Sequence, residues 1–124
     1  MRLLVDGMNV IGTRPDGWWR DRHGAMVRLV DSLERLASAS GDDITVVFER
    51  RPSPPISSTA IEVAHAPRPR RDSADDEIVR LVAADPESSR MRVVTSDRWL
   101  AARARKVGAS VESADSIRRR LDDV

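Results

Sequence analysis

Three aspartates stand at places in the sequence where a carboxylate could do chemistry. Asp6 directly follows the apolar run LLV, Asp97 follows VVTS, and Asp75 lies in SADDEIV at the start of a helical pattern. Carboxylates that gather at one place repel one another unless a cation or a shared proton relieves them. Because the chain has no cysteine and only two histidines, an all-oxygen site would favour Mg²⁺ or Mn²⁺ rather than zinc. Such a site can activate water and neutralise the charge of a phosphodiester.

Small and polar neighbours fit the same chemistry. Asn9 comes three residues after Asp6, and its amide could orient a water molecule or hold a phosphate oxygen. Thr95 or Ser96, in the stretch VVTSD that ends at Asp97, could also orient water or hold a phosphate oxygen. Gly7 would let the backbone come close with no side chain in the way.

Each acid also has a purely structural explanation. Asp6 could cap a helix or a turn after its strand, and Asp97 could cap the following helix with the help of Ser96. Asp75 and Asp76 are ordinary negative charges for a first helical turn, where the helix dipole favours them. Only their meeting at one place would favour the catalytic interpretation.

The elements that must position these residues alternate between strand and helix patterns. Apolar runs of strand type occupy residues 3–5, 44–48, 60–64, 91–97 and 110–112. Helical patterns occupy residues 24–39, the segment from 73 to before Pro86, residues 98–107 and the basic segment SIRRRL. Asp115 is the expected cap of this last helix. Short connections between them predict an α/β fold with a mostly parallel sheet of about five strands sandwiched by helices. Whether 60–64 pairs in parallel is left open.

This fold would bring the acids together. The carboxyl ends of parallel strands form the functional edge of such a sheet, so Asp6 and Asp97 should meet there. Asp75 precedes Ile78 by three residues and therefore shares its inward face. Asp76 is turned about 100° away on the same helix.

Composition limits the class of protein. A chain of 124 residues with 40% hydrophobic and 33% charged residues fits a single domain over 1–124. The first residues are interrupted by Asp6 before any stretch of signal-peptide length, and no run approaches a membrane span. We therefore expect a cytoplasmic protein with no membrane association. Lys106 is the only lysine, so nearly all positive charge is arginine, the side chain best shaped for bidentate phosphate contacts.

Arginines and tryptophans supply the candidate RNA contacts. Trp18 and Trp19 lie in RPDGWWRDR, where one ring could pack on the core and the loop could also be a lid on which a base stacks. The predicted contacts are Arg14, Trp18, Trp19, Arg20, Arg50, Arg51, Arg70, Arg71 and Arg98. Arg118 to Arg120 are more simply explained as solvated surface. His23 and His65 lack partners at ligand spacing.

Other α/β classes lack their motifs. The sequence contains no GxGxxG after the first strand, so a dinucleotide fold would lack its phosphate loop, and it contains no GxxxxGK[ST], which excludes a P-loop NTPase. A phosphatase that forms an aspartyl phosphate would need a second aspartate at the position of Met8. A receiver domain would carry a lysine after a late strand, whereas Lys106 lies near the end of a helix.

Three motifs in this order, VDGMNVIG, SADDEIVRLV and VVTSDRWLAARARKVGA, resemble the bacterial NYN branch of the PIN-like nucleases, close to the YacP-like group. The resemblance runs from Leu3 to about Leu121 and implies a metal-dependent endoribonuclease. Carried over by residue, it implies that Asp6 is the first acid, Asn9 the asparagine of DGxN, Asp75 the acid of (T/S)AD, and Asp97 the acid of TSD with Ser96 beside it. It leaves Asp76 as an auxiliary acid or helix surface, and Asp115 as the one later candidate for a fourth acid.

The resulting hypothesis is hydrolysis of RNA with Mg²⁺ or Mn²⁺. The predicted catalytic residues are Asp6, Asn9, Asp75, Ser96 and Asp97, and the predicted metal ligands are Asp6, Asp75 and Asp97 with Asp76 as a weaker candidate. A ribosome or another protein could present the RNA, and a homodimer could extend the basic surface. The alternatives are a PIN-like module that binds RNA or protein without cutting it, and the toxin of a toxin and antitoxin pair.

Overall fold

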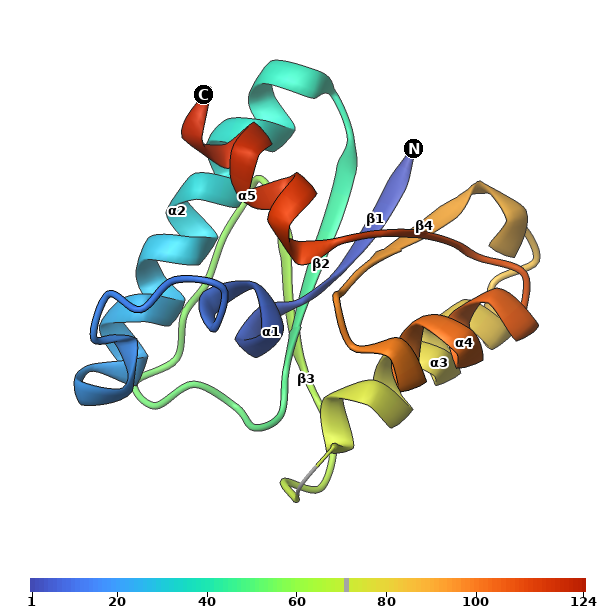
Figure 1. Ribbon diagram of the computed structural model, residues 1–124, viewed down its shortest axis with the longest axis horizontal. Helices are drawn as coiled ribbons and strands as arrows, with labels where there is room; N and C mark the ends of the chain where they lie inside the picture. Colours follow the sequence, from blue (N-terminus) through green and yellow to red (C-terminus); the bar gives the residue numbers. More distant parts are fainter. Residues whose placement is uncertain (71) are drawn as a thin grey trace.

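The computed structural model describes residues 1–70 and 72–124, so the predicted RNA contact Arg71 lies outside the described residues. Its centre is a five-stranded sheet with the order β3-β2-β1-β4-β5, in which every neighbouring pair is parallel (Figure 1). The strands are β1 (Arg2–Asp6), β2 (Asp43–Phe48), β3 (Glu62–His65), β4 (Met91–Val94) and β5 (Ser110–Glu112). The predicted fold class is confirmed, and the pairing of β3, which the sequence left open, is parallel.

Helices cover both faces of this sheet. They are α1 (Gly7–Ile11), α2 (Arg22–Ser40), α3 (Ser73–Ala84), α4 (Arg98–Lys106) and α5 (Ala114–Asp122), with short 3₁₀ turns η1 (Trp18–Arg20) and η2 (Ser88–Arg90). In Figure 1, α1, α2 and α5 lie on one side of the sheet and α3 and α4 on the other. No helix of the described residues has both the length and the apolar character needed to cross a membrane.

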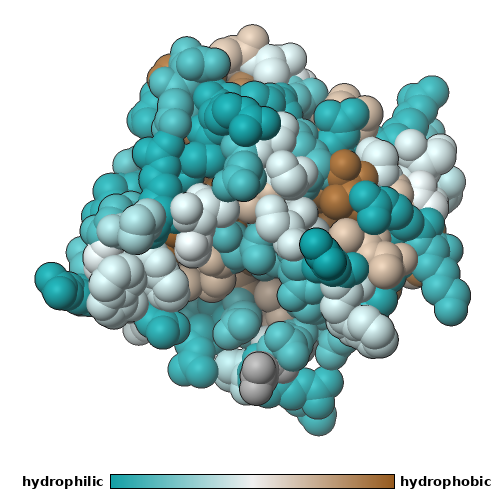
Figure 2. All heavy atoms as spheres, in the orientation of Figure 1, coloured by the Kyte–Doolittle hydropathy of each residue, from teal (hydrophilic) through white to brown (hydrophobic). Residues whose placement is uncertain are grey.

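The side chains of each strand alternate between the two faces of the sheet, and this divides the core into two layers. Leu3 and Val5 of β1 pack with Leu29 and Leu33 of α2, whereas Leu4 between them belongs to the layer under α3 and α4. Successive side chains of a strand point to opposite faces, so a strand with apolar residues at every position must be covered on both sides. The continuous apolar runs in the sequence thus specify a central sheet. Outside this core, the face seen in Figure 2 is mostly hydrophilic, with a hollow below its centre.

Strand order creates a switch point between β1 and β4. From β1 the chain builds β2 and β3 on one side, and β4 leads to β5 on the other. In parallel sheets of this kind, ligands bind outside the carboxyl ends of the strands at the switch point. Asp6 is the last residue of β1, and Thr95 directly follows β4.

Two local features differ from the sequence prediction. Residues 7–11 form the short helix α1, where the sequence patterns predicted no helix. Gly7 begins it because a Cβ there would lie 2.5 Å from the ring of Phe48, far inside van der Waals contact. The predicted cap of the last helix is wrong: α5 begins at Ala114 and is capped by Ser113, whose hydroxyl accepts from the backbone N–H of Ser116.

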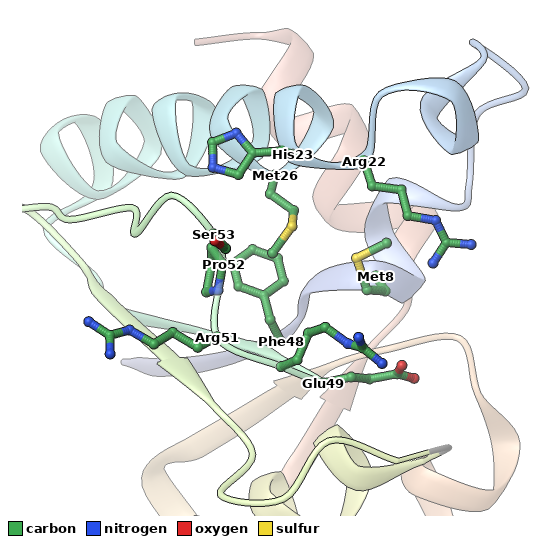
Figure 3. Close-up of a pocket in the computed structure, with 10 residues that line it drawn as sticks. Met8, Arg22, His23, Met26, Phe48, Glu49, Arg51, Pro52 and Ser53 are labelled. Atoms are coloured by element: carbon green, nitrogen blue, oxygen red, sulfur yellow. The ribbon is translucent and has the colours of Figure 1, made fainter.

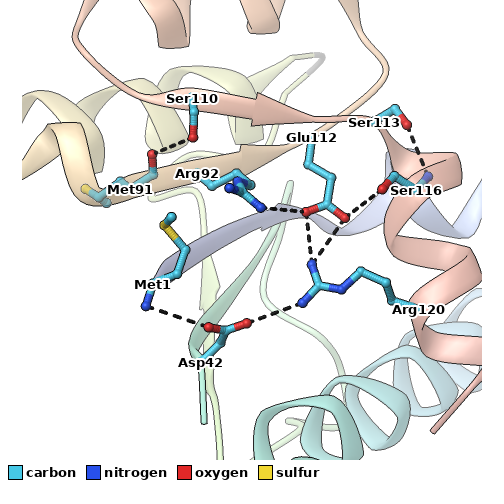
Figure 4. Close-up of polar contacts among 9 residues, drawn as sticks. All are labelled: Met1, Asp42, Met91, Arg92, Ser110, Glu112, Ser113, Ser116 and Arg120. Carbon is cyan, nitrogen blue, oxygen red and sulfur yellow. Dashed lines mark hydrogen bonds and ion pairs between the residues drawn. The ribbon is translucent and has the colours of Figure 1, made fainter. Parts of the chain in front are cut away.

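A polar network joins α5 to the sheet (Figure 4). Arg120 of α5 forms ion pairs with Glu112 of β5, at 3.0 Å, and with Asp42 before β2, at 3.3 Å. Arg92 of β4 lies 3.5 Å from the same Glu112, and the amino group of Met1 lies 3.7 Å from Asp42. Arg120 therefore has a structural role.

Candidate active site: an acid cluster at the switch point

Asp6 is a carboxylate held almost out of reach of water at the end of β1. Its side chain is 6% exposed, and its Oδ2 accepts a hydrogen bond of 3.0 Å from the hydroxyl of Thr95. The pKa of Asp6 is raised from 3.8 to about 6, chiefly by burial; the Thr95 hydrogen bond acts to lower it, and the charges of Asp97 and Glu49 add to the rise. A buried carboxyl group in this environment favours a neutralising partner.

Asp75 is the second buried acid, with 7% exposure on α3. Burial and then repulsion by Asp6, Asp97 and Asp72 raise its pKa from 3.8 to about 7, against the opposing charge of Arg103. The sequence prediction that Asp75 shares the inward face with Ile78 is confirmed by the burial of both.

The start of α3 is fixed against the end of β2. Ser73, which is 4% exposed, donates its hydroxyl hydrogen to the backbone carbonyl of Glu49 at 3.1 Å. Asp72, the residue before α3, has a φ of 61°, in the left-handed region that non-glycine residues rarely adopt. This turn and the Ser73 hydrogen bond set the direction in which α3 carries Asp75 toward the strand ends.

Asp97 has a double role. Its Oδ1 accepts from the backbone N–H of Leu100 at 3.0 Å and so caps α4, as the structural interpretation of the sequence predicts. Its charge also raises the pKa of both Asp6 and Asp75. The cap uses one carboxylate oxygen and holds the side chain beside the other two acids.

Thr95 links the acids more directly than Ser96 does. Its hydroxyl donates to Asp6 and accepts from the backbone N–H of Asp97 at 3.1 Å, and the residue is 2% exposed. Ser96 accepts instead from the backbone N–H of Ala114, at 2.9 Å, at the start of α5. Of the two hydroxyls that the sequence offered, Thr95 is the one that contacts an acid.

Asn9 is placed beside the same strand ends. Its Oδ1 accepts from the backbone N–H of Ser96 at 2.8 Å, which joins α1 to the segment after β4. Because the carbonyl oxygen is used in this way, the NH₂ group of the amide is the part of Asn9 suited to donate to a ligand.

The fourth acid of this region is Glu49, which the sequence analysis did not select. It directly follows Phe48 at the end of β2, the neighbour of β1, and its charge raises the pKa of Asp6. The signal that could have found it is its position after the strand ITVVF. Asp115, the candidate in the sequence, is exposed in the first turn of α5. We call Asp6, Glu49, Asp75 and Asp97 the acid cluster.

The acid cluster does not form a closed set of metal ligands by itself. Among residues 1–70 and 72–124, no three acidic or histidine side chains converge closely enough to enclose a metal ion. The donor set still fits a hard cation, because it consists of carboxylate oxygens, two of them on buried groups whose mutual repulsion a cation would relieve. Oxygens of a phosphate ligand or of water would complete the coordination.

Asp76 is turned away from the cluster. Its carboxylate pairs with Arg103 of α4 at 3.0 Å and with Arg70 at 3.2 Å, and the hydrogen bond from Arg103 lowers its pKa. Both oxygens are thus engaged by arginines at the surface. This geometry favours the interpretation of Asp76 as helix surface and makes Arg70 its partner.

The predicted RNA contacts fall into separate groups. Arg14 forms an ion pair with Asp122 of α5, on the side of α1 and α2. Trp18 packs partly against the core, whereas Trp19 is 51% exposed with the guanidinium of Arg20 at 6.0 Å from its ring. The exposed arginines nearest to the acids in sequence are Arg50 and Arg51, after Glu49, and Arg98, after Asp97.

One exposed aromatic residue was missed. Trp99 at the start of α4 is 72% exposed and follows Asp97 by two residues. An indole ring left in water beside an arginine is a surface on which a base can stack. The sequence signal that could have identified Trp99 is its place in TSDRW, directly after the motif that contains Asp97.

The fold and the cluster together define an α/β domain with its candidate site at the carboxyl edge of a parallel sheet. Residues 3–124 match the family model of the YacP-like NYN domain, and the chain belongs to this family. The resemblance seen in its motifs is therefore confirmed, and membership indicates a nuclease-like role connected with RNA.

Solved structures agree with this assignment. The chain is similar to the crystal structure of Rae1 (YacP) from Bacillus subtilis, with 25% identity and a TM-score of 0.81 over 99% of this chain and 74% of that one. The W164L mutant of the same protein gives 25% identity and a TM-score of 0.80 over 98% and 75% of the two chains. No curated protein sequence gives a significant match.

Proposed function

We propose that this protein is an endoribonuclease that hydrolyses RNA phosphodiester bonds with a bound Mg²⁺ or Mn²⁺. The observation that carries the proposal is the pair of buried carboxylates, Asp6 and Asp75, at the switch point of a domain of the YacP-like NYN family. A protein that only binds RNA gains nothing from negative charge where phosphates must lie. The alternative of a module that binds without cutting therefore has no observation in its favour.

Asp6 and Asp75 would hold the cation, with Asp97 and Glu49 contributing charge from either side. The bound cation would supply an activated water and stabilisation of the leaving oxygen. Thr95 holds the carboxylate of Asp6 in one orientation through its 3.0 Å hydrogen bond. A ligand oxygen that enters this site meets donors already fixed in place, which lowers the cost of reaching the reactive geometry.

Neutral and positive groups would position the RNA. The amide NH₂ of Asn9 is suited to donate to a phosphate oxygen or to the attacking water. Arg50, Arg51 and Arg98 are exposed around the acids and suited to the phosphates on either side of the cleaved bond, because guanidinium groups bind phosphate in a bidentate manner. Trp99 would stack on a base.

An activity of this kind would belong to RNA metabolism inside the cell. A ribosome or another protein that presents the RNA fits a domain of this size, and a second copy of the chain could extend the surface. A dedicated inhibitor protein would mark the toxin alternative, which shares the same chemistry.

The test is incubation of the purified protein with a panel of labelled RNAs in Mn²⁺, in Mg²⁺ and in EDTA. We expect endonucleolytic products in the presence of a divalent cation, and their loss in Asp6→Asn and Asp97→Asn. Asparagine is also a good helix cap, so Asp97→Asn keeps α4 intact. Asp76→Asn is the matched control, since this acid faces two arginines, and it should cut like the wild type. Intact RNA throughout, or equal cutting by Asp6→Asn, would overturn the assignment.

A further inference from the structure

A small apolar pocket lies next to the acid cluster (Figure 3). It has a volume of about 240 Å³. Its apolar lining comes from Met8 of α1, Met26 of α2 and Phe48 of β2, and Pro52 and Ser53 form the wall contributed by the loop after β2. In Figure 3 the side chain of Met26 reaches down toward the ring of Phe48, and Met8 lies to the right of this ring.

The pocket has a positively charged rim. Arg22, Arg50 and Arg51 line it, and the guanidinium of Arg22 lies 5.3 Å from the ring of Trp18, which steadies it. In Figure 3, Arg22 and Arg51 extend outward from opposite sides of the apolar lining. An apolar floor with guanidinium groups at the edge suits a flat, apolar ring joined to negative charge.

The pocket adjoins the acid cluster at Glu49 and Phe48. Glu49 belongs to the cluster and also lines the pocket. Phe48 packs so closely on the backbone of Gly7 that a Cβ there would lie 2.5 Å from its ring, and Gly7 directly follows Asp6. A ligand in the pocket would therefore lie one strand end away from the proposed site of cleavage.

The wall of the pocket is already formed. A ring nitrogen of His23 on α2 lies 2.8 Å from the carbonyl oxygen of Pro54, a hydrogen bond that ties the loop after β2 to α2. Pro52 in the same loop is buried. A site of this kind takes a ligand with little rearrangement, which lowers the cost of binding.

We propose that this pocket receives one nucleobase of the RNA strand whose phosphate lies at the acid cluster. This inference rests on the proposed function and deepens it, because it assigns residues that select the base beside the cleaved bond. The volume is slightly below the roughly 300–1,000 Å³ of sites for larger ligands, and so fits a single base. The polarisable sulfurs of Met8 and Met26 contact aromatic rings favourably, and the arginines at the rim match the phosphates of the same strand.

The methionines themselves provide the test. The chain has four: Met8 and Met26 line the pocket, whereas Met1 and Met91 lie at the amino ends of β1 and β4. In wild-type protein labelled with ¹³C at the methionine methyl groups and kept in EDTA, short RNA homopolymers of each base are titrated. We expect the methyl signals of Met8 and Met26 to shift with at least one base while those of Met1 and Met91 stay in place.

An abasic oligonucleotide of the same length is the matched control ligand. It carries the phosphates without the bases, so it should leave the Met8 and Met26 signals unmoved. The inference is overturned if no RNA shifts these two signals, or if the abasic strand shifts them as much as RNA does.

A blocking variant gives an independent measurement. Ser53→Trp places a ring at the wall of the pocket, and we expect it to weaken RNA binding by about tenfold, the scale of one lost base stack. Ser57→Trp adds the same ring to an exposed position of the same loop outside the lining residues and should bind as the wild type does. Equal affinities of the two variants would contradict the proposal.

These results separate the pocket from the catalytic assignment. Methyl shifts without any cleavage by the metal-loaded protein would support the base pocket and overturn the nuclease proposal. Cleavage of RNA without methyl shifts at Met8 and Met26 would support the nuclease proposal and overturn the base pocket.

Discussion

Replacement of Asp75 by asparagine should make the protein more stable at neutral and alkaline pH. The native carboxyl has a pKa raised to about 7 by burial and by the charges of Asp6, Asp97 and Asp72. Below about pH 3 the group is protonated in both the folded and the unfolded chain and has almost no effect. Between 3.8 and about 7 the folded chain keeps a proton that the unfolded chain loses, so the free energy of unfolding falls as the pH rises through this window.

The size of the effect follows from the two pKa values. A difference between 3.8 and about 7 corresponds to at most roughly 4 kcal/mol, fully present above pH 7. Asparagine removes the charge but keeps a polar group in a site that is 7% exposed, which costs part of this gain. We expect Asp75→Asn to raise the free energy of unfolding by about 2–4 kcal/mol at pH 8 and by almost nothing at about pH 3.

The assay is urea denaturation in EDTA, followed by circular dichroism at several pH values. Asp76→Asn is the control one residue away: its carboxylate is half-exposed and paired with Arg70 and Arg103, so it should lose about 1 kcal/mol or less. Added Mn²⁺ should stabilise the wild type more than Asp75→Asn, because the cation takes over the neutralising role. A loss of stability in Asp75→Asn at pH 8 would refute the repulsion argument.

Three further variants test single contacts. Gly7→Ala should lower the free energy of unfolding by about 1–3 kcal/mol in denaturant titrations, because the new methyl group overlaps the ring of Phe48; an unchanged value would contradict the close approach. Thr95→Val should cost about 1–3 kcal/mol by the same measurement, since it leaves the buried oxygen of Asp6 without its hydrogen bond, and it should also reduce the rate of RNA cleavage. Trp99→Ala should leave the melting temperature unchanged, because the ring is 72% exposed, and should weaken RNA binding about fivefold or more in fluorescence anisotropy; unchanged affinity would remove the ring from the RNA surface.

The sequence predicted most of the fold because its apolar runs specify strands buried on both faces. Leu3, Leu4 and Val5 are all fully buried, as an unbroken apolar run in a central parallel strand requires. The helix α1, which begins at Gly7, was missed because five residues are too few to show a helical period. The cap of α5 was placed at Asp115 rather than Ser113 because both residues have side chains that cap helices.

The candidate site was predictable only where secondary structure fixes direction. Helical spacing placed Asp75 inward, and strand ends placed Asp6 and Asp97 at one edge. The sequence analysis selected Ser96 rather than Thr95, whose hydroxyl contacts Asp6, because which of two adjacent hydroxyls faces the cluster depends on the path of the chain after β4. The sequence analysis did not predict Glu49 as a member of the site for a similar reason. Its nearness to Asp6 depends on β2 being the neighbour of β1, which is a property of the strand order.

The most direct test of the central claim is the initial rate of RNA cleavage by wild type and Asp6→Asn, measured side by side in Mn²⁺ and in EDTA. If the acid cluster binds the cation and carries the reaction, only the wild type in Mn²⁺ cuts, and its rate falls to that of the variant when EDTA is added. Cleavage by the wild type that persists in EDTA, or by Asp6→Asn at the wild-type rate, would contradict the claim.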